Sequence, residues 1–462
     1  MNGLEFKKKH IVMNFLLFGA VVLYVLFIVT NPIGLSKSIY LTFFANLLIV
    51  MVGILSSRSP ISLNKIALYF ILIFLVIVPF YQLTSGYAPR EMDLTHAEIL
   101  YTNLLIFLWC LFYLMSYNVD IGSKKSMTTE PLNIPNSKWF YSFLVGCSVI
   151  SLILAIGLIG FSNLFIRGEA YLDKGTFSIM IDLLIRSIPV ISLSVFLWTK
   201  KKKIDLFSPV IMNSLIVLLG VIVFILNYPV SLSRYMTGAV YLGIIVSGFE
   251  FSLFKGKRFD VLILVTIIVI FPIMYLFKFY TLEQILTTTN LTNINNYNSL
   301  DFDAFQMIGR TIRYTESVGL QLGGQLRSVV LFFMPRAIID LKGIPSGELV
   351  ASFQKVSFIN LSSPMVAEGY IDFGVIGVMM YAVVFGKIAK YFDRTVYKTD
   401  KIKNHVYFNE IAFPFLLGFS VYLYRGALQP SFLRLMGFFL FLIILFVVCK
   451  VASKFQLSDQ FR

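Results

Sequence analysis

Residues 139–159 read WFYSFLVGCSVISLILAIGLI, a stretch without a charged side chain. An α-helix crosses the hydrocarbon core of a bilayer in about 20 apolar residues, so this stretch is long enough to span a membrane. Eleven further runs have a similar length and character, at about 10–30, 37–56, 63–84, 98–117, 178–199, 205–227, 234–253, 259–280, 367–390, 407–426 and 430–450. The sequence therefore predicts an all-α polytopic membrane protein with about twelve transmembrane helices.

Composition excludes the other broad classes of protein. The 462 residues are 58% hydrophobic and 14% charged, with a mean hydropathy of +0.82, whereas soluble domains carry about 25% charge. The net charge of +15 comes from short clusters between apolar runs, which is the placement of topology signals and not of a nucleic-acid-binding arm. Three cysteines at irregular spacing inside apolar segments predict neither a disulfide framework nor a metal-binding motif.

Basic residues cluster on alternate connections between the apolar runs, which predicts a cytoplasmic N-terminus and a cytoplasmic C-terminus. With this orientation, residues 1–280 hold transmembrane helices one to nine, and residues 367–462 hold helices ten to twelve. Residues 281–366 form one large extracytoplasmic loop. Because a long structured loop is more often functional than a spacer, we expect the functional site to involve it.

Two short helices are expected within this loop. Apolar residues recur at helical spacing from Phe302 to Ile312, which predicts an amphipathic helix over 302–320. A second helix is expected to begin after Ser346, with Glu348 in its first turn. Both are expected to lie on or dip into the outer leaflet of the membrane.

The basic residues of the predicted outer side are mostly arginine, whereas those of the inner side are mostly lysine. Topology needs only charge, but the planar guanidinium binds phosphate or carboxylate in a bidentate way. We therefore predict that the outer arginines contact a diphosphate or a glycan. The substrate-binding candidates are Arg234, Arg310, Arg313, Arg327, Arg336 and Arg425. The alternative is that these arginines form ordinary ion pairs with outer acidic residues, for example Arg313 with Glu316.

Residues 364–377, PMVAEGYIDFGVIG, place two acids at the outer start of a helix. Glu368 and Asp372 are four positions apart, so they share a helix face near the positive end of its dipole. A carboxylate can deprotonate a hydroxyl, and these two residues are therefore the predicted catalytic residues. The glycines of the segment are expected to permit close packing. The alternative is a capped helix start with two solvated acids.

Metal and nucleotide chemistry is not expected. Asp301-Phe302-Asp303 has the DxD form found in metal-dependent nucleotide-sugar transferases, but it lies on the predicted outer side, whereas nucleotide sugars are cytosolic. The sequence has no histidine cluster, Walker loop or Gly-rich dinucleotide fingerprint. No metal or cofactor is therefore predicted. Asp182 and Arg186, four apart with the acid first, are expected to form a structural ion pair.

Four segments resemble the bacterial Wzy-type oligosaccharide repeat-unit polymerases, the O-antigen and capsule polymerases. They are SLSRYMTG at 231–238, FFMPRAIIDLKGIPSGELVASF at 332–353, SSPMVAEGYIDFGVIG at 362–377 and YRGAL at 424–428. The resemblance also covers the expected architecture of about a dozen helices, a large late outer loop and a basic outer face.

This resemblance implies a GT-C-like membrane glycosyltransferase in the bacterial cytoplasmic membrane. Such an enzyme would transfer a growing glycan from undecaprenyl diphosphate onto a lipid-linked repeat unit, without nucleotide sugar or metal. Its partners would be the lipid-linked oligosaccharide, the bilayer, and the flippase and chain-length regulator of the same pathway. No nucleic acid is implied.

Two alternatives remain open. An O-antigen ligase-type transferase would have a similar architecture but typically carries a histidine in the large outer loop, and residues 281–366 contain none. A flippase or other transporter of lipid-linked oligosaccharides would place its basic residues in a cavity between two similar halves, and no internal repeat is visible by eye.

Overall fold

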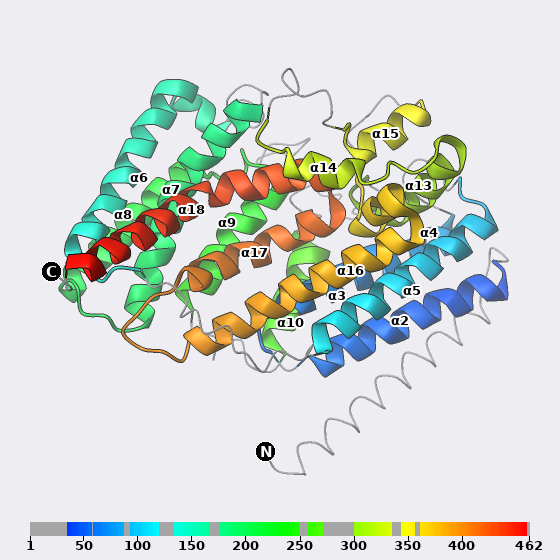
Figure 1. The fold of residues 1–462 in the computed structure, drawn as a ribbon, viewed down its shortest axis with the longest axis horizontal. Coiled ribbons are helices and arrows are strands. Elements are labelled where there is room, and N and C mark those ends of the chain that lie inside the picture. The colour runs from blue at the N-terminus through cyan, green and yellow to red at the C-terminus, as the bar shows by residue number, and fades with distance from the viewer. Residues whose placement is uncertain are drawn as a thin grey trace, which may run out of the picture.

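The computed structural model describes residues 35–57, 59–86, 93–119, 134–166, 176–249, 253, 257–270, 300–334, 343–355 and 361–459 (Figure 1). Within these ranges the chain forms helices and connecting loops, and no β-strand. The predicted all-α class is therefore confirmed for this part of the chain.

The helices are named in chain order, and η denotes a 3-10 or π segment. The first half contains α2 (Lys37–Ser56), α3 (Leu63–Phe70), η1 (Ile71–Ile77), α4 (Val78–Ser85), α5 (His96–Asn118), α6 (Lys138–Ile159), η2 (Ser162–Phe165), α7 (Thr176–Lys201) and α8 (Pro209–Leu226). The second half contains α9 (Arg234–Gly248), α10 (Arg258–Val265), η4 (Thr266–Ile270), η7 (Leu300–Phe302), α13 (Ala304–Val318), α14 (Gly324–Val330), α15 (Ser346–Phe353), α16 (Met365–Thr399), α17 (Phe408–Arg425) and α18 (Leu428–Asp459).

Eight helical stretches within the described residues are long and apolar enough to cross a membrane. They are Lys37–Ser56, Leu63–Ser85, His96–Asn118, Lys138–Ile159, Phe177–Lys201, Pro209–Leu226, Met365–Thr399 and Leu428–Lys450. The predicted run at 10–30 lies outside the described residues, and the run at 259–280 is described only as far as residue 270. The runs at 234–253 and 407–426 correspond to α9, with 15 residues, and α17, with 18. A membrane protein is therefore supported, and the count of twelve stays a prediction.

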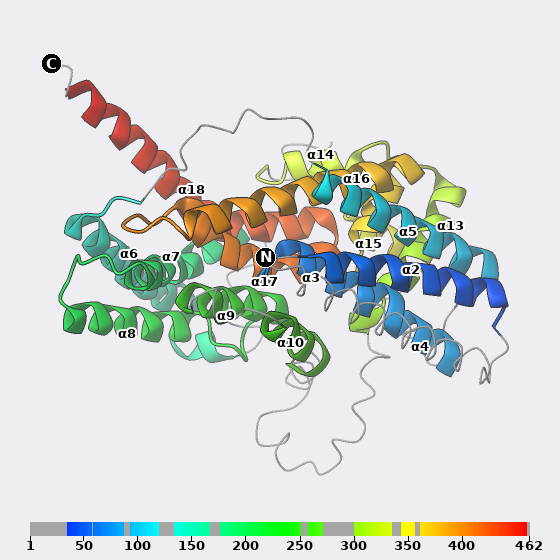
Figure 2. The same cartoon turned by 90° about the horizontal axis from the view of Figure 1, so that it is seen from below.

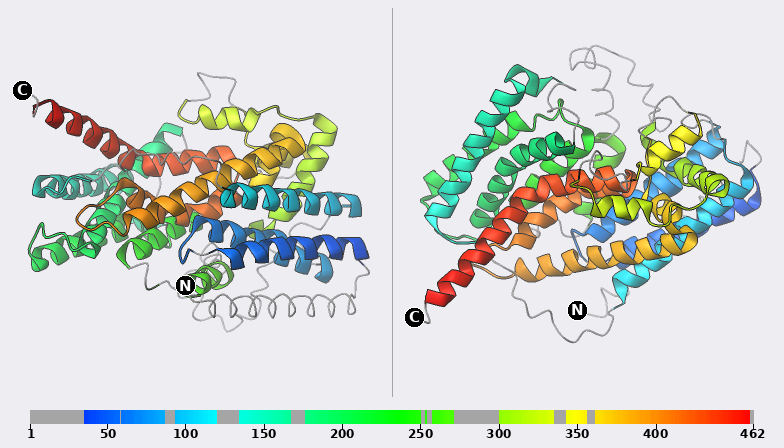
Figure 3. Two further views of the ribbon diagram at one scale, coloured as in Figure 1. Left: turned by 60° about the horizontal axis from the view of Figure 1, so that its bottom comes forward. Right: turned by 45° about the horizontal axis from the view of Figure 1, so that its top comes forward.

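The long helices pack side by side in one bundle, in which α6 is inclined to α2, α5 and α16 (Figures 1 and 2). The closest pairings join α16 to α5, α17 to α9 and α18 to α7. The continuous helix formed by α3, η1 and α4 is the most buried of the spanning stretches, so it forms the centre of the bundle. The short helices α13, α14 and α15 gather at the end of the bundle where α16 begins (Figure 3).

Helix α13 occupies a different place from the one expected. The predicted apolar face is present, and Phe302, Phe305 and Ile308 are all at most 1% exposed. These side chains pack on other helices: Phe302 stacks on Phe74 of η1 at a ring-centroid distance of 5.0 Å, and Phe305 stacks on Phe43 of α2 at 5.4 Å. The prediction that this helix lies on the outer leaflet is therefore wrong, because the bundle itself covers its apolar face.

Helix α16 is broken near its start, and the glycines of the segment explain how. Phe373 and Gly374 leave the helical conformation, with Gly374 at φ +61, a left-handed conformation that glycine adopts without strain. The backbone then folds back so closely that a Cβ on Gly377 would lie 1.9 Å from the carbonyl oxygen of Gly369. The predicted role of these glycines in close packing is confirmed. The kink places residues 365–372 against α15 and the loop at 361–364.

Candidate active site

Glu368 lies in the first turn of α16 and has no exposed surface. Its Oε1 accepts a hydrogen bond from the hydroxyl of Ser346, the first residue of α15. Its Oε2 is buried and has no hydrogen-bond partner within the described part of the chain. The hydroxyl of Ser363 and the backbone amide of Leu428 lie beside the carboxylate. Glu368 is therefore a fully buried carboxylate that accepts one hydrogen bond from Ser346 and has the Ser363 hydroxyl and the Leu428 amide as its other polar neighbours.

Asp372, one turn later, is also fully buried but has a different environment. Its carboxylate accepts hydrogen bonds from the backbone amides of Gln325 and Leu326 at 2.9 and 3.0 Å and from the hydroxyl of Tyr381 at 2.7 Å. It thereby caps the start of α14 and ties α14 to α16. The alternative of two solvated acids is therefore wrong for both residues, and the predicted catalytic role of each stays a prediction.

Arg234 enters α9 beside the loop that precedes α13. Its two terminal nitrogens bind the two carboxylate oxygens of Asp301 at 2.6 Å each. Both side chains are mostly buried, at 15% and 12% exposure. The sequence predicts that this guanidinium binds a phosphate in a bidentate way. In the structure it binds the carboxylate of Asp301 in that way instead.

Arg425 ends α17 and completes the same cluster. Its Nε donates to the backbone oxygen of Asp301 at 2.8 Å, and its Nη2 donates to Asp303 at 3.3 Å. Asp303 is 2% exposed and also accepts a hydrogen bond from the Ser362 hydroxyl. Burial raises the pKa of Asp303 above its ordinary value, while Arg425 and Ser362 oppose that rise.

Backbone contacts join this cluster to Glu368. The amide of Ser363 donates to the backbone oxygen of Arg425 at 3.0 Å, and the side chain of Ser363 lies beside Glu368. The structure thus brings together three of the predicted residues, namely Arg234, Arg425 and Glu368, from three separate helices. We call the set of Arg234, Asp301, Asp303, Ser346, Ser362, Ser363, Glu368 and Arg425 the outer polar cluster, after the side of the membrane that the sequence predicts for it.

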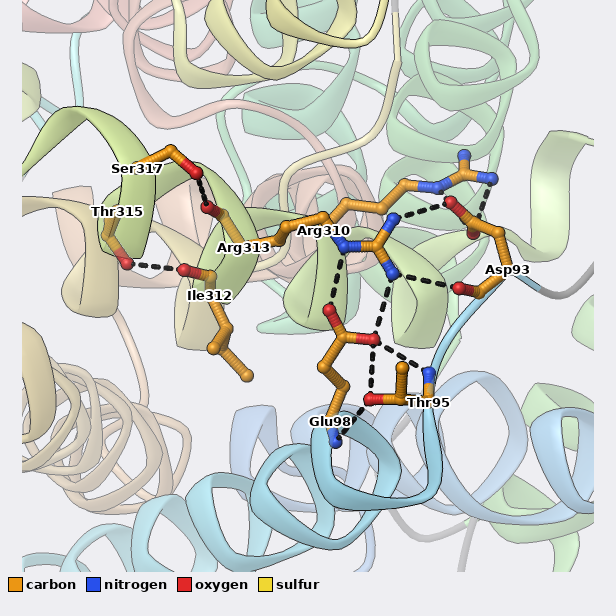
Figure 4. A network of polar contacts seen from close by, with 8 residues as sticks. All are labelled: Asp93, Thr95, Glu98, Arg310, Ile312, Arg313, Thr315 and Ser317. Atoms are coloured by element: carbon orange, nitrogen blue, oxygen red, sulfur yellow. Dashed lines mark hydrogen bonds and ion pairs between the residues drawn. The ribbon is translucent and has the colours of Figure 1, made fainter.

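Arg310 and Arg313 form a second group with the start of α5 (Figure 4). Arg310 donates to Asp93 at 3.1 Å, while Arg313 binds Asp93 at 2.9 Å and Glu98 at 2.7 and 2.8 Å. The carboxylates of Glu98 and Asp93 raise the pKa of Arg313. The suggested pair of Arg313 with Glu316 is therefore wrong, because Arg313 turns toward α5 and Glu316 is exposed.

Arg327 and Arg336 are the two remaining substrate-binding candidates. Arg327, in α14, is exposed and forms no ion pair with any described residue. Arg336 lies outside the described residues. The ion-pair alternative is thus confirmed for Arg234, Arg310, Arg313 and Arg425, and binding of a diphosphate by any of the six stays a prediction.

Sequence reasoning missed the serines of the outer polar cluster and the roles of its aspartates. Asp301 and Asp303 stood out only as a weak DxD motif, and the structure directs both carboxylates toward arginines. No group of three potential metal ligands occurs within the described ranges. The predicted pair of Asp182 with Arg186 is confirmed, at 3.0 Å. The run Ser362-Ser363-Pro364 before α16 was the available signal for the serines.

Comparison of the chain with profiles of known protein families, with curated proteins and with solved structures found no match.

Proposed function

We propose that this chain is a polysaccharide polymerase: a membrane glycosyltransferase that transfers a growing glycan from undecaprenyl diphosphate onto a lipid-linked repeat unit. It would act at the outer face of the bacterial cytoplasmic membrane, with twelve helices in a GT-C-like arrangement. The resemblance at residues 231–238, 332–353, 362–377 and 424–428 motivates the proposal. The observation that carries it is Glu368, a buried carboxylate whose Oε2 accepts no hydrogen bond within the described residues and which shares the outer polar cluster with Arg234 and Arg425.

Glu368 suits the role of general base. The acceptor hydroxyl of the incoming repeat unit would donate to Oε2, the atom without a partner, and would pass its proton there as it attacks the donor sugar. The bond between that sugar and the lipid diphosphate breaks in the same step, and the diphosphate leaves with the bonding electrons. Ser346 holds Oε1 and so fixes the direction of Oε2. Because Glu368 has no exposed surface, the proposed reaction requires a rearrangement that exposes Oε2 to the acceptor hydroxyl.

The arginines would stabilise the charge that develops on the leaving diphosphate. Asp301 and Asp303 hold Arg234 and Arg425 in fixed positions, which removes the need to reorganise them during the reaction. Each of these two arginines is already paired with an aspartate, so an incoming diphosphate competes with Asp301 and Asp303. Arg327 has no such competitor among the described residues, which makes it the arginine best suited to direct contact with a phosphate.

The test is a glycan ladder made by the purified full chain from lipid-linked repeat units. Glu368→Gln is nearly isosteric and removes the proton acceptor, so we expect a loss of turnover of about 100-fold or more with lipid-linked substrate still bound. Glu348→Gln, in the first turn of α15, is the matched control and should leave the ladder unchanged.

Asp372→Asn is a second comparison. It should lower thermal stability through the cap of α14 and should keep activity per folded molecule. Normal ladders from Glu368→Gln would show that Glu368 is not the base. Movement of the lipid across the bilayer by the wild-type protein, without any ladder, would favour the flippase instead.

A further inference from the structure

Helix α14 turns its polar side toward the bundle and its apolar side outward. Gln325 and Ser328 are buried, whereas Leu326 and Val330 are 44% and 66% exposed. Phe333, in the turn that follows α14, is 54% exposed, so large apolar side chains recur on the outward side at spacings of four and three. A helix at the surface of a water-soluble protein has the reverse arrangement. The arrangement of α14 suits a helix whose outward side meets hydrocarbon.

Specific hydrogen bonds hold α14 in this rotation. The backbone amides of Gln325 and Leu326 donate to the buried carboxylate of Asp372 at 2.9 and 3.0 Å. The side-chain amide of Gln325 donates to the backbone oxygen of Ile344 at 3.0 Å. Because these bonds fix the polar side inward, Leu326 and Val330 cannot turn toward the bundle while the bonds are kept.

The neighbouring helix α18 shows what lies outside α14. Helix α14 packs beside the first half of α18 (Figure 1), where the rings of Phe332 and Phe432 meet edge to face at a centroid distance of 5.4 Å. No residue from 428 to 442 is exposed. The second half of α18, which belongs to a spanning stretch, exposes large apolar side chains, namely Ile443, Ile444, Phe446, Val447 and Val448. Helix α14 is among the elements that cover the first half, so its outward side continues the apolar surface of the bundle.

Depth and charge both place α14 near the boundary of the membrane. The spanning stretch of α18 begins at Leu428, and Phe432 lies about 6 Å further along the helix at 1.5 Å per residue. Helices that lie in a membrane surface bury their apolar side by about 5–10 Å. Arg327 is the only charged residue from 320 to 334, and it is exposed beside Leu326. An arginine beside apolar surface extends its guanidinium toward headgroup phosphates, which it binds strongly.

We propose that α14 is embedded in the surface of the membrane leaflet that adjoins the outer polar cluster. Leu326, Val330 and Phe333 contact lipid acyl chains, and Arg327 binds a headgroup phosphate. Helix α14 is thus a membrane-contacting element in addition to the eight spanning stretches within the described residues. The proposed transfer reaction is not needed for this contact, so the two proposals stand or fail separately.

The experiment measures the medium around nitroxide labels on the purified full chain in phosphatidylcholine nanodiscs. Leu326→Cys and Val330→Cys are labelled separately, in a background that carries Cys110→Ala, Cys147→Ala and Cys449→Ala. Electron paramagnetic resonance then reports collisions of each label with oxygen, which concentrates in hydrocarbon, and with a nickel chelate, which stays in water. Two labelled positions keep the test valid if one of the variants fails to fold.

Two further positions calibrate the measurement. Val447→Cys, on the exposed second half of α18, is the lipid reference, and Glu316→Cys, at the exposed end of α13, is the water reference. We expect the ratio of oxygen to nickel collisions at Leu326 and Val330 to match that at Val447 and to exceed that at Glu316 several-fold. A label at Arg327→Cys should give an intermediate ratio, because headgroups lie between water and hydrocarbon.

The proposal is overturned if the labels at Leu326 and Val330 meet the nickel chelate as often as the label at Glu316, since α14 would then face water. It is equally overturned if both labels collide rarely with either reagent, because another part of the chain or a second copy would then cover this side of α14. A label at Arg327 that is as inaccessible to nickel as the one at Val330 would overturn the contact with a headgroup phosphate.

Discussion

Glu368 and Asp372 show how two identical functional groups one helical turn apart acquire different chemistry. Asp372 accepts three hydrogen bonds and joins α14 to α16, whereas Glu368 has one oxygen without a partner. Their spacing predicts a shared face but cannot predict this difference. The donors to Asp372 come from Gln325 and Leu326, which lie far earlier in the chain. Residue spacing therefore located the pair, and only the folded chain separates the roles of its members.

Asp303 makes the outer polar cluster sensitive to pH. Burial raises its pKa in the folded protein, so the folded state binds this proton more tightly than the unfolded state does. Its contribution to stability is therefore greatest below the ordinary aspartate pKa and is lost as the pH rises through the folded-state value. Asp303→Asn resembles the protonated form, so we expect its Tm to exceed that of the wild type most at pH 7.

The measurement is the Tm of both proteins in the same detergent from pH 7 down to pH 4. The gap between them should close as the pH falls. A gap that stays constant or widens toward low pH would show that Asp303 is instead stabilised as an anion by Arg425. The sequence could not predict this residue's behaviour, because its environment depends on Ser362 and Arg425, which lie far later in the chain.

At the scale of elements, the kink of α16 depends on one close backbone contact. A Cβ on Gly377 would lie 1.9 Å from the carbonyl oxygen of Gly369, which backbone atoms cannot accommodate without moving. We expect Gly377→Ala to lower the free energy of unfolding by about 2 kcal/mol or more and to abolish function. Gly146→Ala, in α6, meets nothing within 4 Å and should be neutral or slightly stabilising.

Reversible unfolding of both variants in mixed detergent micelles checks this expectation. Equal stabilities for the two alanine variants would show that the α16 backbone can open at the kink without cost.

The docking of α13 onto α5 rests on Arg313 and tests the corrected pairing. Arg313 is 32% exposed at its side chain and binds Glu98 and Asp93, so Arg313→Gln should cost about 1 kcal/mol of stability. Glu316→Gln is the comparison variant, and we expect no change because Glu316 is exposed and unpaired within the described residues. A larger loss for Glu316→Gln than for Arg313→Gln, measured by thermal unfolding, would restore the pairing first suggested by their spacing.

Helix α13 also shows which element-level features a sequence carries. Periodicity identified its extent to within two residues and its apolar face correctly, since both follow from local spacing. Its location did not follow, because an amphipathic face is equally compatible with a membrane surface and with a groove between helices. The Phe74, Phe43 and Asp93 side chains that receive α13 come from three distant parts of the chain.

At the scale of the whole molecule, the long helices separate two polar regions whose basic residues differ in type. The outer polar cluster combines arginines with aspartates and serines, whereas the other end carries lysines, including Lys202, which binds Glu410 at 2.7 Å. The alternation of basic clusters along the sequence predicts this separation. It cannot predict which loops close over each end, because that depends on contacts between helices far apart in the chain.

The orientation of the chain in the membrane is the prediction on which the proposed transfer reaction depends. Lys202 contacts Thr399 at the end of α16 through its backbone oxygen, at 3.2 Å, whereas Asp303 contacts Ser362 just before α16 begins. The part of α16 after its kink, residues 375–399, extends about 37 Å at 1.5 Å per residue, more than the hydrocarbon core of about 30 Å. Residues near 202 and near 303 should therefore lie on opposite sides of the membrane.

Reporter fusions test this in intact bacteria. A reporter fused after Lys202 should report the cytoplasm, and one fused after Asn296, shortly before Asp301, should report the outside. A fusion after Lys257 is the internal control and should agree with Lys202. A cytoplasmic signal at Asn296 would place the outer polar cluster inside the cell, and the proposed reaction at the outer face would then have to be abandoned.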